Sequence, residues 1–142
     1  MKFEDMDVWK VAARLSVSVY RELAHLKDYG FRDQITRSGL SISSNIAEGF
    51  RFVLGEQSMK SMRGKRGEDL IFNGSESSSR ANRASVKVTF DNASRLFDVD
   101  FDEVSIERAV LRDGVNQYAI NGSTVRLKDV VELLANANIG AT

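Results

Sequence analysis

Residues 59–66 come nearest to a known binding motif, and the chemistry that such a motif would provide is phosphate binding. A phosphate-binding loop has the pattern G-x-x-x-x-G-K-[ST], in which backbone N–H groups and the lysine hold the phosphates. The chain's only Gly-Lys pair is Gly64-Lys65, but Arg66 follows it and Met59 stands where the first glycine is needed. We therefore expect no nucleotide hydrolysis by this chain on its own.

The same stretch carries cations that could bind DNA phosphates. Residues 51–66 hold five basic residues against the single acid Glu56. The four that lie nearest one another are Lys60, Arg63, Lys65 and Arg66. Such a cluster binds the DNA backbone without sequence preference, and about four contacts give only weak, salt-sensitive affinity. The alternative, which we favour for the chain alone, is a solvated loop that Glu68 and Asp69 partly neutralise.

Other residue types offer no ligand or nucleophile pattern. Asp98, Asp100 and Asp102 alternate along an expected strand edge, where three carboxylates without carbonyls and a turning loop do not form a cation site. The chain has no Cys, and His25 is its only His, which excludes thiolate and paired-histidine metal sites. We expect no metal site and no catalytic residue.

Composition narrows the remaining function classes. The chain has 142 residues, of which 42% are apolar, enough for one domain or two very small ones. Its 20 basic and 20 acidic residues balance, so net charge predicts neither a nucleic-acid nor a membrane partner. The start, MKFEDMDVWK, lacks a signal-peptide pattern, and no apolar run approaches the roughly 20 residues of a membrane helix. We expect a cytoplasmic protein without membrane contact.

The first third is predicted to be helical. Residues 7–27 place apolar side chains at steps of three and four, as in an amphipathic helix, and a second helix is predicted from near Phe31 to about Ser58. Two helices on a short turn cannot bury their apolar faces without a partner, so we expect self-association. The expected contact residues are Val8, Trp9, Ala12, Leu15, Val19 and Leu23.

Farther along the chain, apolar residues recur at every second position instead of every third or fourth. Residues 85–90 alternate polar and apolar types, and residues 97–101 do so with aspartates, both as in strands with one buried face. Asp113-Gly114 and Asn121-Gly122 are hairpin signals. Helical spacing resumes over residues 127–137. The expected fold is α+β, with a helical hairpin followed by a small antiparallel sheet and a C-terminal helix.

Two stretches within residues 1–50, FEDMDVWK and FRDQITRSGLSISSNIAEGF, carry a family resemblance together with the helix between them. They resemble the first half of the bacterial four-helix-bundle proteins encoded in ribosomal-RNA intervening sequences. The run from Ser44 to Gly49 is highly specific to that family, although members usually have Pro where this chain has Ser43. The resemblance implies half of an up-and-down bundle that assembles into ring-like oligomers and has no enzymatic activity.

Three further stretches follow in order: RFVLGEQSMKSMRGKRGEDLIFNGSES, ASVKVTFDN and DFDEVSIERAVLRDGVNQYAINGSTVRLKDVVELLANANIGAT. Over residues 51–142 they resemble the N-terminal head of SMC proteins, the chromosome-condensing ATPases. The resemblance implies a partial ABC-type head lobe, and it implies for Arg63 the arginine-loop role near nucleotide and DNA. The P-loop, glutamine loop, signature motif and catalytic acid of that family fall outside this chain. ATP and magnesium, which intact relatives use, are therefore not expected on this chain alone.

The two resemblances meet between Phe50 and Arg51, and three hypotheses follow. The chain is an SMC head fragment that associates with DNA and nucleotide only when a partner completes it. Alternatively, it is a non-enzymatic bundle module that self-associates. The third hypothesis is a rearranged or misassembled, chimeric reading frame without its own function, which one sequencing read across the codons for Phe50 and Arg51 would test.

Overall fold

The computed structural model describes residues 3–54 and 67–139, and the chain divides into two compact units. The hairpin unit comprises Met1–Gly49, and the sheet unit comprises Phe50–Thr142. In chain order the elements are a 3₁₀ helix (Phe3–Asp5), α1 (Asp7–Leu23), α2 (Tyr29–Val53), a second 3₁₀ turn (Gly67–Leu70), β1 (Arg83–Asp91), β2 (Glu103–Leu111), β3 (Asn116–Ile120), β4 (Ser123–Val125) and α3 (Leu127–Asn136). The expected α+β fold, with a helical hairpin, an antiparallel sheet and a C-terminal helix, is confirmed.

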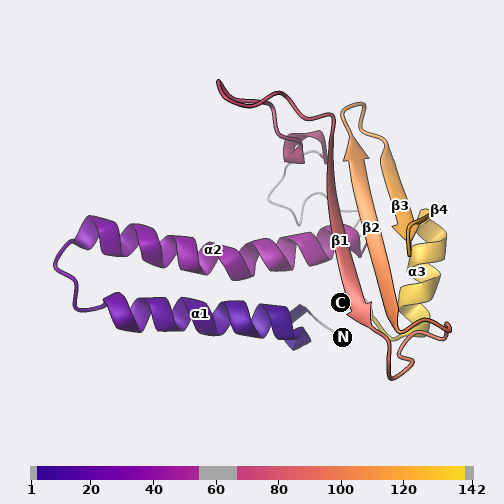
Figure 1. Cartoon of the computed structure of the whole chain (residues 1–142), viewed down its shortest axis with the longest axis horizontal. Helices are drawn as coiled ribbons and strands as arrows, with labels where there is room; N and C mark the ends of the chain where they lie inside the picture. The colour runs from indigo at the N-terminus through magenta and orange to yellow at the C-terminus, as the bar shows by residue number, and fades with distance from the viewer. Residues whose placement is uncertain (1–2, 55–66, 140–142) are drawn as a thin grey trace. The chain divides into compact units, whose positions relative to one another are not determined.

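The hairpin unit is formed by α1 and most of α2, which run antiparallel (Figure 1). Their contact includes a side-chain bond between the helices, because the buried Ser16 hydroxyl donates to the carbonyl of Gly39 at 2.7 Å. The same hydroxyl lies 3.1 Å from the carbonyl of Ala12 one turn earlier, so it remains hydrogen-bonded inside the hairpin. No helix in the described ranges is long and apolar enough to span a membrane.

The sheet has the order β1-β2-β3-β4, with every neighbouring pair antiparallel. Both predicted hairpin signals fall at its turns. Gly114 (φ +84°) lies between β2 and β3, while Asn121 (φ +47°) and Gly122 (φ +82°) join β3 to β4. Glycine and asparagine adopt such positive φ values most readily. The two dipeptides therefore predicted the positions of the turns.

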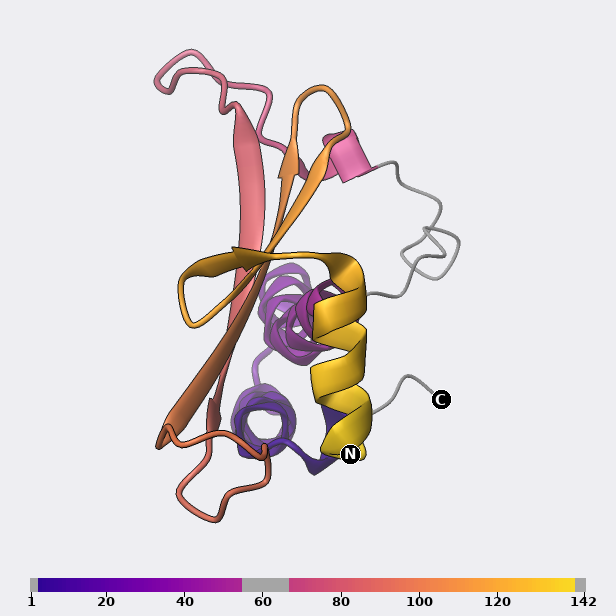
Figure 2. The same ribbon diagram turned by 90° about the vertical axis from the view of Figure 1, so that its right-hand side faces the viewer.

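One face of the sheet is buried. Val104, Ile106 and Val110 alternate along β2 and are fully buried. Phe52, at the end of α2, packs with Val110 and with Ile71, which follows the second 3₁₀ turn. The C-terminal helix α3 contacts β3 (Figure 2). Its Val130 and Leu134 are buried, whereas Val131 is half exposed.

The first turn of α3 is held by Asp129. Its carboxylate accepts from the backbone N–H of Arg126 at 2.9 Å, an otherwise unpartnered donor at the helix start. That backbone bond, followed by the side-chain bond from Arg126, lowers the pKa of Asp129 below its ordinary value. The fold of α3 is therefore supported by a charged cap next to β4.

Candidate functional site

The four predicted DNA-contacting residues, Lys60, Arg63, Lys65 and Arg66, lie outside the described residues. The described segments on either side of them are α2 and the second 3₁₀ turn. Arg108 of β2 binds the carboxyl end of α2, and Arg112, one residue beyond β2, binds residues that follow the second 3₁₀ turn.

Arg108 fixes the end of α2. Its Nη1 donates to the carbonyl of Phe52 at 2.8 Å, and its Nε donates to Oδ1 of Asn116 at 3.0 Å. Its guanidinium carbon lies 4.4 Å from the centre of the Phe52 ring and 5.6 Å from that of Tyr118. The residue is only 6% exposed. A buried cation is thus stacked between aromatic rings and binds a carbonyl at the negative end of the helix dipole.

Arg112, one residue beyond β2, binds the segment that follows the second 3₁₀ turn. Its Nη1 donates to Oδ1 of Asn73 at 2.7 Å, and its Nη2 donates to the carbonyls of Phe72 and Ala81 at 3.0 and 2.7 Å. Two arginines four residues apart therefore bind the end of α2 and the segment that follows the second 3₁₀ turn.

Sequence reasoning missed both arginines. A signal for Arg108 was available, since it occupies an inward position in the apolar alternation of β2, between Ile106 and Val110. An arginine at such a position needs a hydrogen-bonded partner inside the fold. Its partner, the carbonyl of Phe52, lies 56 residues away along the chain.

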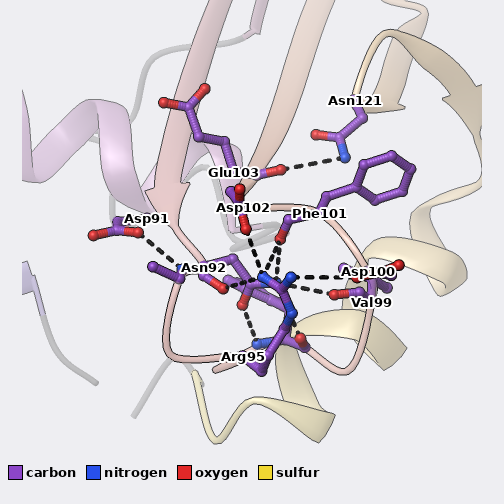
Figure 3. Close-up of polar contacts among 11 residues, drawn as sticks. Asp91, Asn92, Arg95, Val99, Asp100, Phe101, Asp102, Glu103 and Asn121 are labelled. Atoms are coloured by element: carbon purple, nitrogen blue, oxygen red, sulfur yellow. Dashed lines mark hydrogen bonds and ion pairs between the residues drawn. The ribbon is translucent and has the colours of Figure 1, made fainter.

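The expected strand over residues 97–101 is wrong, because residues 92–102 form a loop around Asn92 (Figure 3). The fully buried Asn92 donates from Nδ2 to the carbonyls of Phe97, Val99 and Phe101 at 3.1, 3.2 and 2.8 Å. Its Oδ1 accepts from the backbone N–H of Phe97 at 2.8 Å. One amide side chain thus satisfies backbone groups that a strand would have paired with a neighbour.

The aspartates of this loop form ion pairs with an arginine. Arg95, whose φ is +55°, reaches Oδ1 of Asp100 at 3.2 Å and Oδ1 of Asp102 at 3.0 Å. Asp98 is exposed. Within the described ranges no cluster of His, Cys, Asp or Glu could hold a metal ion. Here the carboxylates anchor the arginine that closes the loop.

An open hollow of about 710 Å³ lies beside this loop, on the polar face of the sheet. Its lining combines Lys87 and Thr89 of β1 with Glu103 and Ser105 of β2 and the Asn121-Gly122 turn. The lining presents no histidine or cysteine as nucleophile or base. We assign no chemistry to it.

The hairpin residues predicted to mediate self-association have mixed environments. Ala12 is buried, and Trp9, Val19 and Leu23 are half-buried. Val8 and Leu15 are 53% and 47% exposed. These two exposed positions are the ones that remain available to a partner.

Two family models match the chain. The RecF/RecN/SMC N terminal domain matches residues 38–142, and the 23S rRNA-intervening sequence protein matches residues 4–63. The two matches overlap at residues 38–63. Both predicted resemblances are thereby confirmed.

Individual relatives agree with the first of these matches. The chain is 45% identical over 97 residues to the chromosome partition protein Smc of Bacillus subtilis, covering 68% of this chain and 8% of that protein. It is 41% identical to an Smc head domain with an extended coiled coil from Pyrococcus furiosus, bound to the C-terminal domain of ScpA, with a TM-score of 0.65 over 69% of this chain and 25% of that one. A structure from a study of ATP-driven dimerization and DNA-stimulated activation of SMC ATPases matches at 41% identity, with a TM-score of 0.64 over 68% of this chain and 58% of that one. The chain thus spans less than a tenth of the length of the Bacillus subtilis protein.

Proposed function

Because the chain belongs to the RecF/RecN/SMC N-terminal domain family, we propose that it is a fragment of a chromosome-partition ATPase head that works only when a partner supplies the remainder. The supporting observation is the likeness of the sheet unit to solved Smc heads at 41% identity and TM-scores of 0.64 and 0.65. In this proposal the sheet unit is one lobe of a cytoplasmic assembly. The basic residues Lys60, Arg63, Lys65 and Arg66 contact the DNA phosphates.

The proposal assigns no catalysis to the chain alone. Gly64-Lys65 is followed by Arg66 rather than Ser or Thr, so the residues present do not complete a phosphate cradle for ATP and magnesium. We expect no phosphate release when the purified chain is incubated with ATP and Mg²⁺. Turnover that disappears in Lys65→Ala would contradict this proposal.

DNA binding through the basic stretch can be tested against the solvated-loop alternative, in which Arg63 makes no contact with DNA. Arg63→Ala should lower the affinity for double-stranded DNA about five- to tenfold near 0.1 M salt, because one phosphate contact and its released counterion are lost. The slope of log affinity against log salt should become shallower by about 0.9. Fluorescence anisotropy of a labelled duplex at several salt concentrations measures both quantities.

The matched control for Arg63→Ala is Arg80→Ala, which removes the same charge from an exposed arginine outside the basic stretch. Its affinity and salt slope should stay close to those of the unmodified chain. Equal losses in the two variants would show that only net charge matters, and the proposed contact by Arg63 would then be wrong.

A further inference from the structure

The outer edge of β1 carries backbone groups that point away from the sheet. β1 is the first strand in the order β1-β2-β3-β4, and all nine of its residues pair with β2. The register continues past both strand ends, because Asn92 N–H donates to the carbonyl of Asp102 at 2.7 Å and Arg112 N–H donates to that of Asn82 at 3.2 Å. In an antiparallel pair, alternate residues exchange these bonds. Even-numbered residues of β1 therefore bond to β2, and odd-numbered residues direct N–H and C=O outward.

This edge is long and unpaired within residues 3–54 and 67–139, where β2 is the sole strand that pairs with β1. The outward groups belong to Arg83, Ser85, Lys87, Thr89 and Asp91. The opposite edge strand, β4, has three residues and so offers far less backbone. An exposed edge of this length is a template for a further strand.

We propose that β1 pairs antiparallel with β1 of a second copy of this chain, about a two-fold axis at Lys87. Centring the pair on Lys87 is the one antiparallel register in which all nine residues of both strands overlap. It brings outward-directed residues face to face, as hydrogen-bonded pairing requires. It also joins the two sheets so that their apolar faces, carrying Val86 and Val88, become continuous.

Side-chain charge favours this partner and register. Arg83 lies opposite Asp91 of the second copy, and Asp91 opposite Arg83, which gives two opposite-charge pairs, while Ser85 faces Thr89. The unfavourable pair is Lys87 with its own copy at the centre. In each chain Glu107 lies opposite Lys87 on β2, and its Oε1 accepts from Nη2 of Arg83 at 3.0 Å, so Arg83 would lie between Glu107 and Asp91 of the second copy. The inference concerns assembly and does not depend on DNA or nucleotide binding.

A charge-exchange experiment tests the register. Arg83→Asp places Asp opposite Asp in a homodimer, and Asp91→Arg places Arg opposite Arg. Each variant should therefore dimerise about tenfold more weakly than the unmodified chain in sedimentation equilibrium. Mixed one to one, the two variants regain both opposite-charge pairs, and a heterodimer of near-original affinity should form. This recovery cannot come from a variant that has merely lost its fold.

Single cysteines give a second readout, because the chain has none of its own. Hydrogen-bonded partners in an antiparallel pair have Cα atoms about 5.5 Å apart, within disulfide range. Lys87→Cys should therefore cross-link to its copy on mild oxidation, whereas Gln117→Cys, on an internal strand, should not. Association through the hairpin unit instead would leave both charge variants fully assembled. That result, absence of recovery on mixing, or equal cross-linking of the two cysteines would each overturn the inference.

Discussion

Arg108→Ala should lower the free energy of unfolding of the sheet unit by about 3–5 kcal/mol. The substitution leaves the buried carbonyl of Phe52 without its donor at 2.8 Å, which alone costs about 1–3 kcal/mol. It also removes the cation stacked between Phe52 and Tyr118 and leaves a cavity between their rings. Hydrogen exchange of the β2 amides, measured by mass spectrometry, reports the sheet unit separately from the hairpin unit.

Two further variants separate the causes. Arg108→Met keeps much of the buried volume but none of the donors, so we expect it to recover only part of the loss. Arg80→Ala removes an exposed arginine of the same unit and should change stability by no more than about 0.5 kcal/mol. If Arg108→Ala were as stable as Arg80→Ala, the proposed anchoring of the α2 end would be wrong.

The elements that sequence pattern predicted well are those with local causes. The alternation over residues 85–90 became β1, and the dipeptides at 113–114 and 121–122 became turns because their backbone conformations favour Gly and Asn. The spacing over residues 127–137 became α3. Each of these signals lies within a few residues of the structure it specifies.

The features that pattern missed depend on contacts distant in the chain or on a single side chain. Residues 97–101 alternate as a strand would, but Asn92 already binds three of the loop's carbonyls, so no neighbouring strand is needed. Arg108 is buried because it binds the carbonyl of Phe52, 56 residues away along the chain, and no local pattern indicates that contact. The candidate DNA-contacting residues stay a prediction, because they lie outside the described ranges.

Asn92→Asp should be the most damaging conservative change in the loop, with a loss of about 4 kcal/mol in the sheet unit. The substitution preserves shape but replaces a donor by an acceptor at the centre of three carbonyls, at 3.1, 3.2 and 2.8 Å. Those carbonyls would lose the amide donor of Asn92 and face a carboxylate oxygen at a fully buried position. The carbonyl of Phe97 would keep the N–H of Val99, and that of Phe101 would keep Arg95. Urea unfolding and hydrogen exchange of residues 92–102 measure the loss.

The same substitution at Asn121 is the matched control. At Asn121 the shorter hydrogen bond is made by the oxygen, because Oδ1 accepts from the N–H of Ser105 at 2.8 Å. The amide nitrogen Nδ2 is 3.5 Å from the carbonyl of Glu103 (Figure 3). Asn121→Asp retains the acceptor and should cost well under the loss at Asn92. Equal losses at the two positions would show that introduced charge, rather than donor loss, is the cause.

The pH dependence distinguishes donor loss from a packing defect. Surrounding carbonyls oppose ionisation of the carboxyl group introduced by Asn92→Asp, so its pKa in the folded protein should exceed its unfolded value. A group of this kind contributes stability below its unfolded pKa, and that contribution is lost as the pH rises through the folded pKa. Once protonated, the group can again donate to one carbonyl. The deficit of Asn92→Asp relative to the unmodified chain should therefore shrink as the pH falls through the folded pKa of this carboxyl group and be smallest below about pH 4, whereas Asn92→Ala should show the same deficit at every pH. A deficit for Asn92→Asp that is independent of pH would mean that the loop is held by packing of Phe97 rather than by the amide of Asn92.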